Sequence, residues 1–178
     1  AMGGEGTTTE RLMAMHIVPL SISYEFDPCD FLKAKEFQMK RDNPAYKKTR
    51  ADDLVNMQTG LFGYKGRVHY ACAPCIDDWI ATQEGLSNAE FFAATARRLD
   101  EEIYRNYRLY PNNFVALDLL NNEKDYISHY SEEDKVQFEQ YLRQQIDKID
   151  LPNKDEAFLR ERLLEMYANP AKNQLAIS

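Results

Sequence analysis

Residues 15–30 decide the fold and read Met15-His16-Ile17-Val18-Pro19-Leu20-Ser21-Ile22-Ser23-Tyr24-Glu25-Phe26-Asp27-Pro28-Cys29-Asp30. The first half is apolar, largely β-branched and as long as a typical strand, which predicts a buried β-strand over 17–23. Pro19 has no N–H to donate to a neighbouring strand, so we expect this strand to lie at an edge or to be bulged there. Asp27 and Asp30 then predict a helix start, because aspartate accepts hydrogen bonds from the free N–H groups of a first turn.

A second strand is predicted over 67–73, where Val68, Tyr70 and Cys72 alternate with more polar or smaller residues. Two helices are expected between the strands, one over 31–41 and one that starts near Pro44 and carries an apolar face. Strand, helices and strand in this order are typical of a crossover that joins parallel neighbours. The sequence therefore predicts a mostly helical α/β fold with a small, two- to three-stranded parallel sheet and crossover helices.

The second half of the chain predicts helices. Ser87-Asn88-Ala89-Glu90 has the pattern of a capping box and precedes a long amphipathic helix, and Pro111 begins a shorter, apolar one. Two charged amphipathic segments over 131–149 and 154–167 are separated by Leu151-Pro152-Asn153, which predicts an antiparallel helical hairpin. We thus expect a flexible N-terminal end over 1–13, an α/β part over 14–121 and a helical hairpin tail over 122–178.

Composition limits the partners and the compartment. The net charge of −7 argues against general binding of nucleic acid, and we interpret the aromatic and basic run over 104–110 as core packing. Three cysteines cannot all pair within the chain, which favours a reducing, cytoplasmic location. No apolar run approaches the roughly 20 residues that span a bilayer, so we expect any membrane contact to be peripheral, at the inner face.

Three segments resemble a known family. Ile17-Val18-Pro19-Leu20-Ser21-Ile22 is similar to the last of four sequence blocks of the glycerolipid acyltransferases, the lysophosphatidate and glycerol-3-phosphate acyltransferase superfamily. The phrase through Asp30 resembles a bacterial branch of that family, as does the run Tyr107-Arg108-Leu109-Tyr110-Pro111-Asn112-Asn113. Gly66-Arg67-Val68-His69-Tyr70-Ala71-Cys72-Ala73-Pro74 resembles the next strand of the family and its turn.

The resemblance implies phospholipid biosynthesis, with transfer of a fatty acyl chain from acyl-CoA or acyl carrier protein to an acceptor of the glycerol phosphate type. It implies that Val18 and Pro19 form a wall of the acceptor site, and that no metal or bound cofactor takes part. Basic side chains near that site meet phosphate or the acidic membrane surface in the family. Lys47, Lys48 and Arg50 are the candidates here, and a solvated helix face is the alternative.

The family's catalytic His-x-x-x-x-Asp block and its arginine-bearing phosphate block both precede the Val-Pro strand. Sixteen residues precede Ile17, so we expect the C-terminal part of such an enzyme, inactive by itself, whose partner is the missing N-terminal half. An uncovered strand edge and apolar face then predict self-association, most simply as a homodimer. The competing hypothesis is a non-catalytic helical module for protein interaction.

Two other motifs invite a chemical interpretation. His129 and Asp134 have the His-x-x-x-x-Asp spacing but follow the Val-Pro strand, and Ser131 with the acidic residues after it predicts a helix start instead. Cys72-Ala73-Pro74-Cys75 is compatible with a redox pair or, together with His69 and Cys29, with a zinc site. Small buried cysteines are the favoured interpretation.

Overall fold

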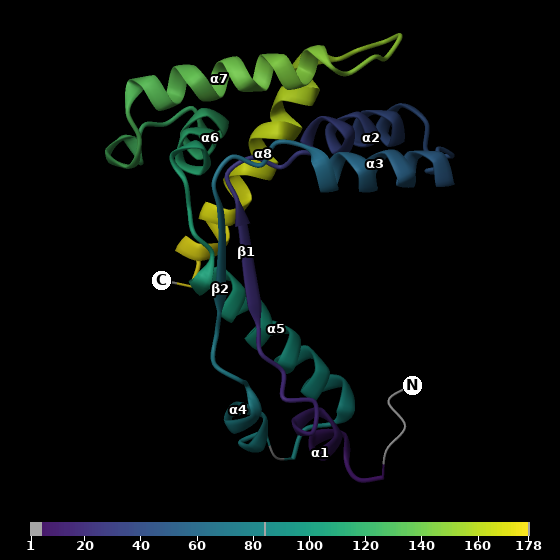
Figure 1. Ribbon diagram of the computed structural model, residues 1–178, viewed down its shortest axis with the longest axis vertical. Coiled ribbons are helices and arrows are strands. Elements are labelled where there is room, and N and C mark those ends of the chain that lie inside the picture. The colour runs from purple at the N-terminus through teal and green to yellow at the C-terminus, as the bar shows by residue number, and fades with distance from the viewer. Residues whose placement is uncertain (1–4, 84, 178) are drawn as a thin grey trace. The chain divides into compact units, whose positions relative to one another are not determined.

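The computed structural model describes residues 5–83 and 85–177 (Figure 1). Within these ranges it contains eight α-helices, one short 3-10 helix and one two-stranded sheet. The chain divides into two compact units. Unit 1 holds the described residues of 1–23 and 69–108, with Ile177, and unit 2 holds 24–68 and 109–176. The boundaries expected from the sequence, after residues 13 and 121, differ from this division.

The sheet is antiparallel, so the predicted parallel pairing is wrong. Strand β1 (Leu20–Tyr24) pairs with β2 (Val68–Cys72). The amide of Ala73 donates to the carbonyl of Pro19 at 2.9 Å, and the amide of Glu25 donates to the carbonyl of Arg67 at 2.9 Å. The helices between the strands therefore leave and return at the same end of the ladder, which forces β2 to run opposite to β1. Pro19 contributes its carbonyl to the ladder and stands just before the first residue of β1, a position at the end of a strand where proline is tolerated.

Unit 1 has a small core under three helices. These are α1 (Thr8–Met13), α4 (Asp77–Ala81) and α5 (Asn88–Asn106). Buried Leu12, Ile80 and Phe91 from the three helices pack together, with Ile17 beside them. The capping box of Ser87 and Glu90 at the start of α5 is confirmed. Helix α1 lies inside the predicted flexible end, whose residues 1–4 are outside the described residues.

Unit 2 is a helical body with the larger core. It contains α2 (Asp30–Asp42), α3 (Arg50–Phe62), α6 (Pro111–Asn121), the 3-10 helix (Ile127–His129), α7 (Glu132–Asp147) and α8 (Glu156–Leu175). Buried Val115 of α6, Phe138 of α7 and Leu163 of α8 share one hydrophobic cluster with Ala34 of α2. The short apolar helix predicted to begin at Pro111 is confirmed as α6. Figure 1 shows α8 crossing α7 steeply, so the two helices do not lie side by side as a simple hairpin.

Asp30 has a different role from the predicted helix cap. Its side chain is fully buried, and its Oδ2 accepts hydrogen bonds from the hydroxyls of Tyr141 at 2.7 Å and Tyr167 at 2.6 Å. Burial raises the pKa of the Asp30 carboxyl, although the hydrogen bonds from the two tyrosines act in the opposite direction. Asp30 therefore joins the start of α2 to α7 and α8.

Candidate functional site

One face of the sheet in unit 1 is apolar and open to solvent. The register places Leu20 opposite Cys72 and Ile22 opposite Tyr70, all on one face of the pleat. Val18 precedes Leu20 by two residues and belongs to the same face. The side chains of Val18, Leu20, Ile22 and Tyr70 are between 40% and 60% exposed. We call these four residues and the exposed Cys72 the open sheet face.

The opposite face carries the small polar residues of β1. Ser21 and Ser23 are buried, and the Oγ of Ser23 accepts a hydrogen bond from the backbone N–H of Arg108 at 2.8 Å. The prediction of a strand with buried apolar side chains is therefore wrong for Leu20 and Ile22. Because side chains alternate along a strand, a register that buries the two serines must turn both apolar residues to solvent.

The two residues predicted to line an acceptor site behave differently. Val18 is half-exposed and belongs to the open sheet face, whereas Pro19 is buried. The side chain of Val18 is thus available to a ligand or to another segment of polypeptide. Pro19 instead shapes the backbone at the point where β1 begins.

The basic residues precede α3, with Arg50 as its first residue. Thr49 is the N-cap, and its side chain accepts a hydrogen bond from the N–H of Asp52. The predicted helix start near Pro44 is therefore several residues too early. Within the described part of the chain, Lys47 and Arg50 are exposed and form no ion pair, whereas Lys48 lies 3.5 Å from Glu36 and 3.3 Å from Asp53. Val18 and Pro19 are in unit 1 and these three residues are in unit 2.

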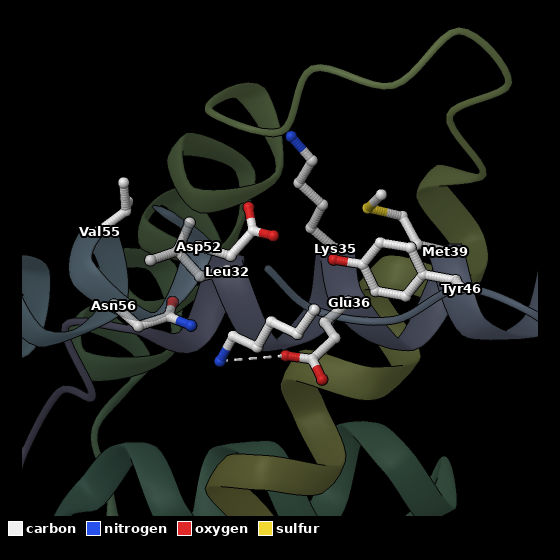
Figure 2. Close-up of a pocket in the computed structure, with 9 residues that line it drawn as sticks. Leu32, Lys35, Glu36, Met39, Tyr46, Asp52, Val55 and Asn56 are labelled. Atoms are coloured by element: carbon white, nitrogen blue, oxygen red, sulfur yellow. Dashed lines mark ion pairs between the residues drawn. The ribbon is translucent and has the colours of Figure 1, made fainter. Parts of the chain in front are cut away.

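A groove of about 330 Å³ lies between α2 and α3 (Figure 2). Lys48 is among the residues that line it, and Lys47 and Arg50 are not. Burial acts to lower the pKa of Lys48, but hydrogen bonds and charge from Asp53 and Glu36 outweigh it and raise the pKa. Since two carboxylates already neutralise this ammonium group, the groove offers no free cation at Lys48 for a phosphate.

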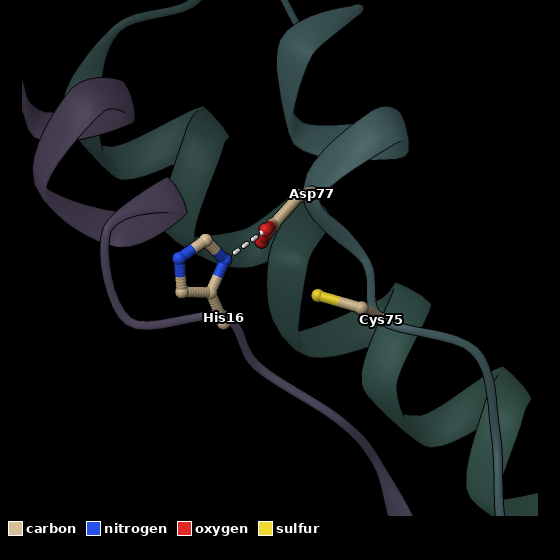
Figure 3. Close-up of side chains that lie close together, drawn as sticks. All are labelled: His16, Cys75 and Asp77. Carbon is tan, nitrogen blue, oxygen red and sulfur yellow. Dashed lines mark hydrogen bonds and ion pairs between the residues drawn. The ribbon is translucent and has the colours of Figure 1, made fainter.

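A second cluster lies in unit 1, where His16, Cys75 and Asp77 converge (Figure 3). The Nδ1 of His16 is 2.6 Å from Oδ2 of Asp77, and the three possible ligand atoms lie within 4.8 Å of one another. This pair is separated by 61 positions along the chain, so no motif could have revealed it. The His16 side chain is 76% exposed and its Nδ1 is taken by Asp77, which makes the two a hydrogen-bonded pair at the surface.

The cysteines are more accessible than predicted. Cys72 and Cys75 are exposed and Cys29 is half-buried, so the interpretation of small buried cysteines is wrong for the C-x-x-C pair. The four residues considered for zinc, Cys29, His69, Cys72 and Cys75, do not form a ligand cluster among the residues that the structure describes.

Replacing His16 by alanine is expected to raise the pKa of Asp77. The hydrogen bond from His16, with a smaller one from Cys75, holds the pKa of this carboxyl below its usual range. Because the pKa of Asp77 is lower in the folded chain than in the unfolded chain, its ionised carboxyl stabilises the fold at any pH above the unfolded pKa of about 4. That stabilisation is lost as the pH falls through the folded pKa. Carbon NMR titration of the Asp77 carboxyl measures the shift. His69→Ala is the control, and a midpoint of Asp77 that is the same in wild type and His16→Ala would refute the role of the pair.

The His-x-x-x-x-Asp spacing of His129 and Asp134 is structural, as predicted. The ring of His129 stacks on Phe114 with 4.2 Å between centroids. Asp134 instead forms a capping box with Ser131, whose N–H and hydroxyl it accepts at 2.8 and 2.6 Å. His129 and Asp134 therefore do not form a catalytic pair.

The chain matches no known family model, no curated protein and no solved structure. Within the described residues, no helix is both long and apolar enough to cross a membrane.

Proposed function

We propose that this chain is the C-terminal part of a glycerolipid-type acyltransferase. In this proposal the open sheet face is covered by a preceding part of the same polypeptide, which carries the catalytic His-x-x-x-x-Asp block. The reaction moves a fatty acyl chain from an acyl thioester to a hydroxyl of a glycerol phosphate type acceptor. The sequence resemblance of residues 17–22 and 66–74 supplies the choice of family.

The open sheet face is the observation that supports the proposal. A sheet with one face packed on the core and the other exposed to water turns its apolar residues to the core and its polar residues to water. Here β1 does the opposite, since Ser21 and Ser23 are buried while Leu20 and Ile22 are exposed. Apolar surface costs about 25 cal/mol for each Å² left in water, which favours a covering layer. In the isolated chain, a second copy can take that place, which is the reason to expect self-association.

The chemistry divides between the two parts of such an enzyme. The preceding part supplies a histidine general base and an aspartate that orients it, so that the acceptor hydroxyl can attack the thioester carbon. This chain supplies Val18 at the open sheet face, beside the point where Pro19 fixes the backbone. Lys47 and Arg50, exposed and free of ion pairs among the described residues, are the cations available for phosphate or an acidic surface.

The test compares one substitution in two proteins. Ile22→Asp in the isolated chain, at a concentration low enough to keep it monomeric, is expected to change the free energy of unfolding by no more than about 0.5 kcal/mol, because Ile22 is exposed. The same substitution in the natural, longer polypeptide buries a charge and is expected to cost at least about 2 kcal/mol. Val136→Asp on α7 is the matched control for an exposed apolar residue. Equal, small effects of Ile22→Asp in both proteins would show that nothing covers this face.

A non-catalytic interaction module is the second candidate, and one observation favours it. Unit 2 has a hydrophobic core of its own, with fourteen buried residues, so it needs no catalytic part in order to fold. A natural polypeptide without a His-x-x-x-x-Asp block before Val18, in which unit 2 binds another protein, would select this alternative.

A further inference from the structure

Helix α3 has its apolar residues on the outside. It has no buried residue, and five large hydrophobic side chains on it are between 50% and 81% exposed. These are Leu54, Val55, Met57, Leu61 and Phe62. The apolar face predicted for this helix is therefore turned to solvent.

Helix α3 is amphipathic, and its polar side is less exposed to solvent than its apolar side. At 100° per residue, the five side chains fall on one arc of roughly 160°, which we call the α3 apolar arc; the exposed Gln58 lies within it as well. The other side consists of Asp52, Asn56, Thr59 and Gly60, which are half-buried. Contacts with α2 come from that side, where the thiol of Cys29 donates to the carbonyl of Asn56 at 3.3 Å. An outward apolar arc of this size needs a partner that is itself apolar.

The charged residues around α3 indicate which kind of partner would bind the apolar arc. Residues 24–68 of unit 2 contain nine lysines and arginines against seven aspartates and glutamates, a net charge of +2 in a chain whose total is −7. Lys47 and Arg50 stand at the start of α3, while Asp52 and Asp53 lie outside the apolar arc. Lys65 lies just beyond the end of α3, where its ammonium also donates to the carbonyls of Leu61 and Gly63. The arc is therefore flanked by cations and contains no acidic residue.

We infer that α3 lies in the surface of an anionic lipid bilayer, with the α3 apolar arc among the acyl chains and the flanking cations at the lipid phosphates. Helices with one apolar face and basic flanks bind bilayers in this way, with the apolar face buried about 5–10 Å into the boundary between headgroups and acyl chains. Each cation near an anionic surface strengthens binding about fivefold at moderate salt. This inference deepens the proposed function, in which Lys47 and Arg50 meet phosphate or an acidic surface. Because binding is measured without turnover, its failure is distinguishable from a failure of acyl transfer.

The experiment is co-sedimentation of the full chain with two kinds of vesicle, pure phosphatidylcholine and phosphatidylcholine with about one third phosphatidylglycerol. We expect binding to the anionic vesicles, weaker binding to the neutral ones, and a decrease as salt is raised. Leu61→Asp combined with Phe62→Asp is expected to lower the affinity at least tenfold, because two large side chains leave the acyl region. Lys47→Glu combined with Arg50→Glu is expected to weaken binding to anionic vesicles only.

Two control variants lie on α7, in the same unit. Val136→Asp places a charge at another half-exposed apolar residue, and Arg143→Glu reverses an exposed cation. Both should bind vesicles like wild type, and circular dichroism should show all variants folded. Wild type that binds neither vesicle, or binding that the α3 variants leave unchanged, would overturn the inference. So would a dimer that forms without lipid and is dissolved by the Leu61 and Phe62 substitutions, since a second copy would then cover the arc.

Discussion

Asp30→Ala is expected to lower the free energy of unfolding of the chain by about 3 kcal/mol. The substitution removes the acceptor that the hydroxyls of Tyr141 and Tyr167 share at 2.7 and 2.6 Å. The hydroxyl of Tyr167 also accepts the backbone N–H of Asp27 at 3.1 Å, so the loss extends to the turn before α2. Buried polar groups left without a partner cost about 1–3 kcal/mol each, which makes this larger than the effect of a surface change. Urea unfolding followed by circular dichroism measures it.

Two further variants separate the hydrogen bonds from the charge. Tyr141→Phe removes one donor and is expected to cost about 1 kcal/mol. Asp30→Asn keeps an acceptor and should lose less than Asp30→Ala. An Asp30→Ala variant within 0.5 kcal/mol of wild type, a margin typical of neutral surface changes, would show that the cluster does not stabilise unit 2.

The pH dependence of the same variants has a defined sign. Burial raises the folded pKa of Asp30, so the contribution of its proton to stability is complete below the unfolded pKa, about 3.9, and is lost as the pH rises through the folded pKa. The advantage of wild type over Asp30→Asn should therefore shrink as the pH rises above about 4. An advantage that grows with pH would mean that the charged form of Asp30 is the one stabilised.

The isolated chain is expected to show no transfer from an acyl thioester to a glycerol phosphate acceptor. A positioned general base contributes typically 10²–10⁴ to the rate, and the described residues provide none beside a substrate cavity. His129 stacks on Phe114, and His16 pairs with Asp77 but is 76% exposed, without walls that would position an acceptor. A radiolabelled acyl transfer assay measures this. Turnover that is abolished by His129→Ala or by His16→Ala, with the fold intact, would contradict both this expectation and the structural role given to that histidine.

Local signals in the sequence predicted the helices better than they predicted the tertiary arrangement. The capping boxes at Ser87 and Ser131, and Pro111 at the start of α6, are properties of a few adjacent residues, and the structure confirms all three helix starts. The direction of a strand, and the side of a strand or helix that faces the core, depend on the whole fold. The residues of the two strands, 20–24 and 68–72, do not show whether the strands are parallel. That depends on which end of β1 the chain reaches after the helices between the strands.

The candidate sites were also predictable only in part, because local sequence patterns do not show which side of an element faces the core. The open sheet face could not be foreseen, because an apolar β-branched run has the same pattern whether it faces a core or solvent. The spacing of the apolar residues in the sequence predicts the α3 apolar arc. Which side of the helix faces the protein depends on how the helix packs. The His16 and Asp77 pair joins residues far apart in the sequence and leaves no local signal.

The most direct test of the proposed function is to read the natural polypeptide on the N-terminal side of this segment. Mass spectrometry of the endogenous protein, captured with an antibody against unit 2, gives its intact mass and the peptides that precede Val18. The proposal predicts a longer chain with a His-x-x-x-x-Asp block followed by an arginine-bearing block. An endogenous protein whose sequence before Val18 contains no such pair would contradict the proposal that this chain is part of an acyltransferase.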